Sequence, residues 1–257
     1  LVTGWFILYN RLVSGFKSNF KNTVIRKVVA FISNDLAYSP ESFIDQGTYM
    51  ETGMFPRTPD RYRGDDLVQG LLDKTDLRFS ELHSEYKTET RDSKGNRRTT
   101  WHTIFRGLFF VADFHKDFKG RILVLPDSAE KLFGKLLGQM FQSWNKGRGE
   151  LVKLEDSDFE KAFVVYATDQ IEARYVLSTS LIRRILDFVS KTRKLVHLSF
   201  FKNKVAVAVS YSRVLFEPRV FSSLLDFELI KTYYEDMALA VGIVEELNLN
   251  TRIWTKG

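Results

Sequence analysis

The chain has 257 residues, of which 44% are hydrophobic and 14% aromatic, so global disorder is excluded and one large core or two small ones are expected. Lys and Arg outnumber Asp and Glu by 38 to 32, which gives a formal net charge of +6. The absence of cysteine excludes disulfides, thiolate metal sites and cysteine nucleophiles. The longest apolar runs fall far below the roughly 20 residues that a membrane-spanning helix needs.

The basic surplus lies mainly in three clusters, at residues 57–63, 94–98 and 183–194. Basic clusters suit an anionic membrane surface or nucleic acid. Clusters as dispersed as these are also typical of ordinary solvated surface. We therefore expect no nucleic-acid partner.

Residues 1–35 are interpreted as a juxtamembrane segment and an N-terminal helix. The aromatic run at residues 5–9 is followed by Arg11, Lys17 and Lys21, as at the cytoplasmic end of a membrane helix. The hydrophobic start of a helix in a water-soluble domain has the same appearance. Between residues 20 and 32 the apolar positions recur at helical spacing, which predicts an amphipathic helix.

Residues 36–147 are expected to form a first α+β half. Residues 46–64 show no periodicity and predict a surface loop, followed by a short strand at 67–72. Residues 76–111 predict a long hairpin that turns at 94–96, and its return strand is apolar on both faces near its end, as in the centre of a sheet. A strand at 121–125 and an amphipathic helix with an apolar stripe over 132–144 follow.

Residues 148–257 are expected to form a second half, after a glycine-containing boundary at 147–149, although the two halves are also compatible with one continuous domain. The expected elements are a strand at 163–167, a helix at 181–189, a hairpin at 195–211 and a C-terminal helix at 230–247. Hairpins are mixed with helices without strict alternation. The predicted fold class is therefore α+β, with a mixed, mainly antiparallel sheet and packed amphipathic helices.

The sharpest candidate site is formed by Asp113, His115 and Asp117. Residues two apart on a strand point the same way, so two carboxylates and one imidazole would share a face and offer metal or ligand contacts. The run also ends in charged residues before Gly120, which is typical of a solvated turn. His83, His102 and His197 stand alone on expected strands and predict structural or surface roles.

A second polar segment contains Asp169, Glu172 and Arg174, which are candidates for a charged network. The structural alternative is that Asp169 caps a helix while Ile171, Tyr175 and Val176 pack inside. No serine lies in a GxSxG elbow and the glycines form no nucleotide-binding loop, so neither a hydrolase nucleophile nor a cofactor is expected.

Three stretches resemble the bacterial family catalogued as domain of unknown function 3137. They are residues 105–114 with 119–120 and 125–127, residues 154–181, and residues 247–254. Members of that family resemble membrane proteins with hydrophobic helices ahead of this domain. The resemblance implies anchoring through a segment upstream of Leu1, gives no residue a catalytic role, and offers LemA-type membrane proteins as a partner class.

The functional expectation is a membrane-associated bacterial protein in which this chain is a cytoplasmic binding or scaffold domain, without an evident catalytic motif. The alternative is a metal-dependent enzyme that uses the Asp113, His115 and Asp117 face.

Overall fold

The computed structural model describes residues 2–91, 95–128, 149–218, 227–247 and 249, and of residues 2–10, 227 and 229 only the backbone. The helices are α1 (Val2–Phe20), the π-helix η1 (Lys21–Ile25), α2 (Arg26–Ile32), α3 (Gln46–Glu51), α5 (Ser157–Ala162), α6 (Gln170–Val176), α7 (Thr179–Thr192) and α8 (Phe227–Glu246). The strands are β1 (Leu36–Ser39), β2 (Arg61–Leu72), β3 (Thr75–Arg91), β4 (Arg97–Asp113), β5 (Arg121–Pro126), β6 (Glu150–Val152), β7 (Phe163–Ala167), β8 (Val196–Phe201) and β9 (Lys204–Ser210).

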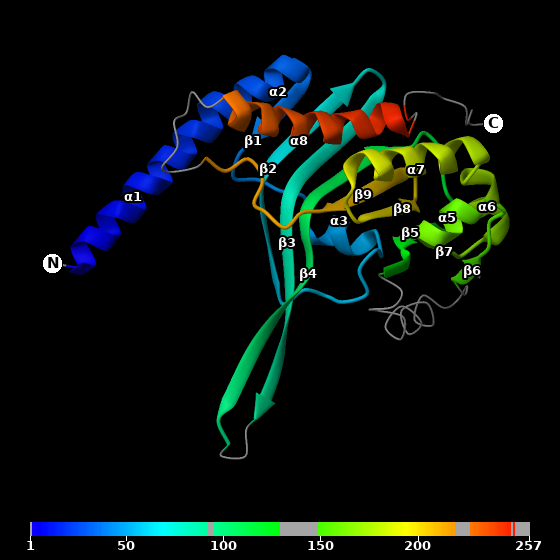
Figure 1. Cartoon of the computed structure of the whole chain (residues 1–257), viewed down its shortest axis with the longest axis horizontal. Coiled ribbons are helices and arrows are strands. Elements are labelled where there is room, and N and C mark those ends of the chain that lie inside the picture. Colours follow the sequence, from blue (N-terminus) through cyan, green and yellow to red (C-terminus); the bar gives the residue numbers. More distant parts are fainter. Residues whose placement is uncertain (1, 92–94, 129–148, 219–226, 248, 250–257) are drawn as a thin grey trace.

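The described strands form one nine-stranded sheet in the order β1-β2-β3-β4-β9-β8-β5-β7-β6 (Figure 1). Every pairing among them is antiparallel, and helices pack on the sheet, so the predicted α+β class is confirmed. β9 lies between β4 and β8, so strands from residues 36–147 and from residues 148–257 share this one sheet.

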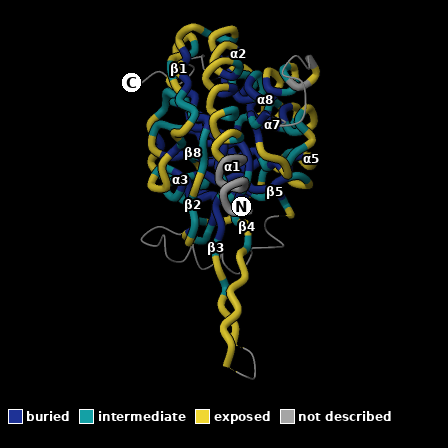
Figure 2. Tube along the Cα trace, turned by 90° about the vertical axis from the view of Figure 1, so that its left-hand side faces the viewer, coloured by how far each residue is buried: buried dark blue, intermediate teal, exposed yellow. Residues whose placement is uncertain are grey.

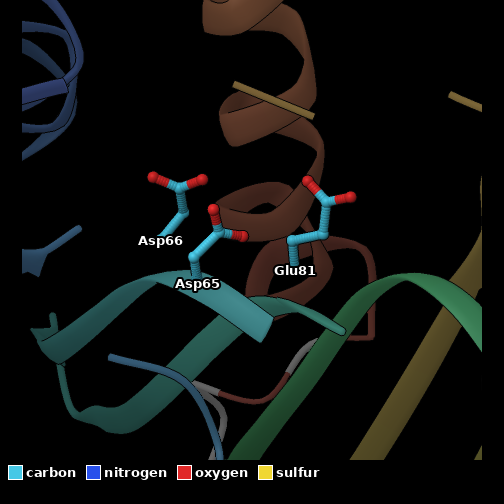
Figure 3. Close-up of side chains that lie close together, drawn as sticks. All are labelled: Asp65, Asp66 and Glu81. Atoms are coloured by element: carbon cyan, nitrogen blue, oxygen red, sulfur yellow. The ribbon is translucent and has the colours of Figure 1, made fainter. Parts of the chain in front are cut away.

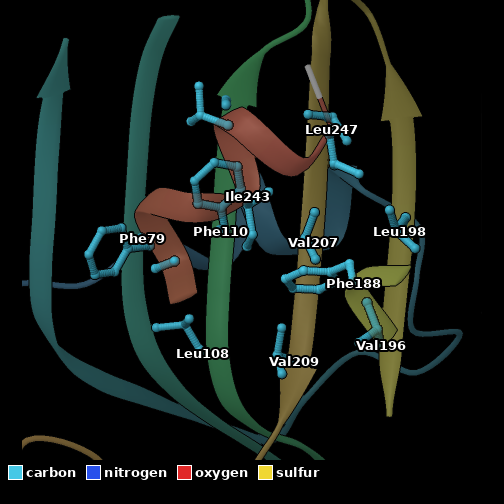
Figure 4. Packing of buried hydrophobic residues seen from close by; sticks show 14 of the residues in the cluster. Phe79, Leu108, Phe110, Phe188, Val196, Leu198, Val207, Val209, Ile243 and Leu247 are labelled. Carbon is cyan, nitrogen blue, oxygen red and sulfur yellow. The ribbon is translucent and has the colours of Figure 1, made fainter. Parts of the chain in front are cut away.

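The sheet buries apolar side chains on both faces. On one face α2, α7 and α8 cover a large cluster, and Figure 4 shows Phe110 of β4 and Val207 of β9 beneath Ile243 of α8. On the other face α3 and the segment around it cover a smaller cluster that includes Phe109. Because Phe109 and Phe110 point to opposite faces and both are fully buried, the predicted central position of this strand is confirmed.

The predicted long hairpin is confirmed, and its outer part extends away from the sheet. β3 and β4 continue pairing from Glu85 and Thr103 out to Arg91 and Arg97. Most residues in this outer part are exposed and are coloured yellow on the tube of Figure 2. We call the paired residues 86–91 and 97–102 the arm.

α1 is the second projecting element. It continues without a break into η1 and α2, because Phe20 and Arg26 keep helical backbone angles at both ends of η1. α2 lies beside β1 and α8, whereas α1 runs away from the sheet toward the N-terminus (Figure 1). The helix predicted at residues 20–32 is confirmed and is longer than expected.

The surface loop predicted for residues 46–64 is wrong. Asp45 caps α3 by accepting a hydrogen bond from the backbone N–H of Thr48 at 2.8 Å, and Tyr49 of α3 is buried against Phe109. β2 then begins at Arg61 rather than at residue 67. A helix of six residues is too short to show a hydrophobic period. The stripe predicted over 132–144 and most of the boundary at 147–149 lie outside the described residues.

Candidate functional site

A β-bulge in β2 places two adjacent aspartates at the centre of a buried charged cluster. Asp65 pairs with Glu81 and Val68 pairs with Phe79, so β2 holds one residue more than β3 between these pairs. The extra residue adopts a left-handed backbone at Asp66 (φ 59°), a conformation that Asp tolerates better than most residues. The side chain of Asp66 is fully buried as a result.

Lys21 brings the positive charge to this cluster from the N-terminal helix. Its Nζ donates hydrogen bonds to Asp65 Oδ2 at 2.5 Å and to Asp66 Oδ2 at 2.8 Å. The hydroxyl of Tyr38 on β1 donates to Asp66 Oδ1. Lys21 is the first residue of the π-helical turn, a wider turn that often marks functional positions within α-helices.

The segment that leads to α8 closes the cluster. Glu217 lies 3.1 Å from Lys21 Nζ and 2.5 Å from Lys17 Nζ. The backbone N–H of Leu215 donates to Glu81 Oε2 at 2.6 Å. Figure 3 shows Asp65, Asp66 and Glu81 side by side, with their carboxylates directed to the same side of β2 and β3. The cluster therefore joins the N-terminal helix, three strands and the segment before α8.

Burial sets the direction of the pKa shift of Asp66 and Glu81, whereas neighbouring charges set that of Lys21. Burial and the Asp65 charge raise the pKa of Asp66 to about 7, although Lys21 and Tyr38 oppose the shift. Burial likewise raises the pKa of Glu81 to about 8. Burial alone would lower the pKa of Lys21, but the charges and hydrogen bonds of Asp66 and Asp65 outweigh it and raise that pKa above its ordinary value. Lys21 therefore stays charged, whereas Asp66 and Glu81 each change protonation state near neutral pH.

Asp65, Asp66 and Glu81 form the only group of three metal-ligating side chains that converge within 4.8 Å among the described residues. Carboxylate oxygens are the ligands that hard divalent cations prefer. Here the Lys21 ammonium and the Tyr38 hydroxyl already bind the Asp66 oxygens. The two Asp66 oxygens thus link the N-terminal helix and β1 to the bulge of β2.

The structure places Asp113 and His115 in contact but not on a strand face. β4 ends at Asp113, and His115 has a left-handed backbone (φ 57°), so the strand alternation behind the predicted shared face is wrong. Asp113 accepts a hydrogen bond from the His115 backbone N–H at 2.9 Å, and its Oδ2 lies 3.2 Å from His115 Nδ1. Asp117 is exposed in the following turn. Binding of a metal or ligand by these residues stays a prediction.

Asp113 also borders a cavity of about 680 Å³. The cavity lies across the ends of β1, β2, β3, β4 and β9. Its charged lining residues are Asp35, Asp76, Arg78, Asp113 and Lys204. Arg78 is also bonded to Thr48 of α3, at 3.0 Å, so α3 stands beside this cavity. The mixture of both charges suits a polar ligand or a polar protein surface.

Asp169 and Glu172 hold backbone groups rather than a network with Arg174. The Asp169 carboxylate caps α6 by accepting from the N–H groups of Ile171 and Glu172. The Glu172 carboxylate accepts from the N–H groups of Lys119 and Gly120 at 3.2 and 3.3 Å. Arg174 donates to Gln170 on the exposed face of α6.

The expected packing of Ile171 and Tyr175 is wrong. Their exposed fractions are 81% and 60%, and Ala173 and Val176 fill the inner face of α6 instead. The Lys116 ammonium lies 4.5 Å from the centre of the Tyr175 ring. α6 therefore presents two apolar side chains to the surface.

The isolated histidines have local partners. His83 lies 3.7 Å from Glu85, and His102 shares a 2.9 Å hydrogen bond with Thr88. His197 is enclosed against Phe55, and burial lowers its pKa to about 4, so its ring is neutral at physiological pH.

A family model described as "Protein of unknown function (DUF3137)" matches residues 103–249, which is more than half of the chain. The chain belongs to this family. The match begins within β4 and includes α6, α7 and α8, so the predicted family is confirmed, and the family brings no assigned activity. We call Lys21, Tyr38, Asp65, Asp66 and Glu81, with Leu215 and Glu217, the Lys21 cluster. Its first five residues lie outside the matched range, whereas Leu215 and Glu217 lie within it.

A search of curated proteins gave no match. A crystal structure of the mycobacterial trehalose monomycolate transport factor A, TtfA, matches with 11% identity over 80% of this chain and 89% of that one. The TM-score is 0.37, too low to establish a shared fold. Within the described residues, no helix combines the length and the apolar character needed to cross a membrane.

The Lys21 cluster was not predicted from the sequence. The adjacent acids Asp65 and Asp66 on a strand were a visible signal, because a charged pair inside a strand places one carboxylate on each face unless the strand is irregular. The partner Lys21 lies 44 residues away and looked like any basic residue on a helix.

Proposed function

We propose that this chain is the binding or scaffold domain of a membrane-anchored protein, with the anchor upstream of Leu1 and the domain on the cytoplasmic side. The observation that carries the proposal is the continuous helix of α1, η1 and α2, which projects from the sheet and is fixed at its base by Lys21. Such a rigid helix fixes the position of the sheet relative to the segment that precedes the helix.

The contacts at its base support a fixed rather than a swivelling connection. Lys21 contacts carboxylates from β2 and from the segment before α8, and Phe20 packs edge-on against Tyr233 of α8 at 5.6 Å. Removing one partner from such a buried ion cluster is costly, so the helix direction is strongly specified. Arg11 and Lys17 on α1 agree with the tendency of cytoplasmic flanks to be basic.

The partner we propose is a membrane protein of the LemA type, bound through a polar surface. The cavity beside Asp113 offers charges of both signs, from Asp76, Arg78 and Lys204, for such a contact. Contacts of mixed charge give specificity more than affinity.

Affinity purification of the full-length protein from native membranes in mild detergent, followed by mass spectrometry against a mock control, tests the proposal. We expect a reproducible membrane-protein partner that is lost from a variant with Arg78→Glu and Lys204→Glu. A matched variant with Lys161→Glu and Lys231→Glu, on exposed positions of α5 and α8, should retain it. The same proteins in the sample and in the mock control would contradict the binding role.

The contact between Asp113 and His115 favours one alternative, a metal-dependent enzyme that also uses Asp117. Metal analysis of the purified chain and thermal melting with added zinc or manganese test it. Stabilisation that disappears in His115→Ala would support the alternative, and an unchanged melting temperature with no bound ion would remove it.

A further inference from the structure

One face of the arm is basic, and its side chains do not pack in the core. Side chains of directly paired residues share a face of a two-stranded ribbon, so the pairs Lys87–Trp101, Glu89–Thr99 and Arg91–Arg97 form one face. Three of these six side chains are basic and one is acidic. The other face holds Arg98 opposite Thr90, with the Tyr86 and His102 rings stacked at its base.

The charge of the arm is positive after its internal ion pairs are counted. Glu89 lies 3.3 Å from Lys87 Nζ and 3.2 Å from Arg97 Nε, so one acidic group serves two basic ones. Arg91 and Arg98 add two further positive charges near the far end. No core contact explains this surplus, because residues 87–91 and 97–101 are exposed or nearly so.

Aromatic and basic side chains continue the surface toward the sheet. Trp101 is 38% exposed, and the Arg61 guanidinium lies 3.8 Å from the centre of its ring. Arg57 lies 4.1 Å from the centre of the Tyr86 ring. These cation–π contacts join the base of the arm to Arg57 and Arg61 of the body.

The direction of the arm favours a flat partner. In Figure 1, α1 and the arm both leave the body, and a line that touches the far ends of both has the sheet and its covering helices on one side. A membrane that holds the segment before α1 would therefore lie within reach of Arg91 and Arg97.

We propose that the arm binds anionic lipid headgroups through Arg91, Arg97 and Arg98 near its far end. This rests on the proposed membrane location. The arm gives the domain a second point of contact besides α1, and two points fix the tilt of the sheet relative to the bilayer. Each basic side chain near an anionic surface adds to the attraction, so three together give a measurable contact.

The test uses the 257-residue chain and co-sedimentation with vesicles of phosphatidylglycerol mixed with phosphatidylcholine. We expect the triple variant Arg91→Glu, Arg97→Glu, Arg98→Glu to lose at least roughly tenfold in affinity. The control Lys161→Glu, Arg174→Glu, Lys231→Glu changes net charge equally at exposed helix positions and should stay within about twofold. Equal losses in both variants, or no loss in the arm variant, would overturn the proposal.

Two further measurements make the result specific. Glu89→Gln removes the one acidic group of the basic face and should raise affinity for the same vesicles severalfold, with pure phosphatidylcholine vesicles showing no binding to any variant. If the arm instead bound a DNA duplex more tightly than the anionic vesicles, the lipid proposal would be wrong. Vesicle binding is measured on the 257-residue chain and tests only the arm. The proposed anchor is tested separately, by extraction of the full-length protein from membranes, so either proposal can fail without the other.

Discussion

Lys21 Nζ and Asp66 Oδ2 are 2.8 Å apart in a site where the aspartate side chain is fully buried. The lysine comes from the N-terminal helix and the aspartate from a bulge in β2. Together with the ion pairs of Lys21 with Asp65 and Glu217, this contact fixes the N-terminal helix on the sheet.

Lys21→Met should destabilise the fold by about 3 to 5 kcal/mol, because the buried Asp66 carboxylate and its neighbour Asp65 lose their cation. Urea denaturation measures the free energy of unfolding. Lys27 lies on α2 and is exposed. Lys27→Met should therefore change the free energy of unfolding by less than about 0.5 kcal/mol. Equal effects from the two substitutions would show that the cluster contributes nothing specific.

Stability should fall as pH rises through neutrality because of Glu81. Its folded pKa of about 8 lies above its ordinary value of 4.5, so the folded state binds the extra proton and is favoured at low pH. The contribution is fully present below about pH 4.5 and is lost as pH approaches 8. Relative to Glu81→Gln, the wild-type free energy of unfolding should drop by at least about 1 kcal/mol between pH 5 and 8.

Asp66 adds to the same trend with a folded pKa of about 7. Asp66→Asn should therefore also weaken the pH dependence of the free energy of unfolding, in the pH range up to about 7. A wild-type stability that rises from pH 5 to 8 in step with both variants would contradict the assignment of these groups.

Gly107→Ala should cost more than about 2 kcal/mol. Gly107 has φ +148°, and a Cβ there would lie 2.1 Å from the carbonyl oxygen of Val209 on the neighbouring strand. Gly15→Ala on α1 is the matched control, because nothing lies within 4 Å of its Cβ position and alanine favours helices. Thermal melting of the two variants would show opposite shifts, and a tolerated Gly107→Ala would argue against this β4–β9 pairing.

Asp169→Ala should cost about 1 kcal/mol through loss of the α6 cap, whereas Arg174→Ala should stay within about 0.5 kcal/mol. Chemical denaturation of the two variants separates a capping role from a charged network. If both substitutions cost the same, and their effects in a double Asp169→Ala, Arg174→Ala variant were far from additive, the two residues would belong to one charged network.

The elements that the sequence predicted best are those set by local pattern. The hairpins of β3 with β4 and of β8 with β9 follow from alternating apolar residues around short turns. The burial of Phe109 and Phe110 on opposite faces follows from the apolar run itself.

What could not be predicted depends on contacts between distant residues or on very short helices. The partner of Lys21 is set by a bulge that moves Asp66 into the core, and no periodic pattern signals a bulge. α6 has seven residues, and the cap at Asp169 rather than apolar spacing decides that Ala173 points inward and Tyr175 outward. His115 left the predicted strand face because β4 ends two residues earlier.

Extraction of the full-length protein from native membranes shows whether a segment that precedes α1 holds this domain at the bilayer. We expect the protein to stay in the membrane pellet after washes with high salt and at alkaline pH, and to enter solution only with detergent. Release by high salt alone would contradict it, because a protein held only by surface charges behaves in that way.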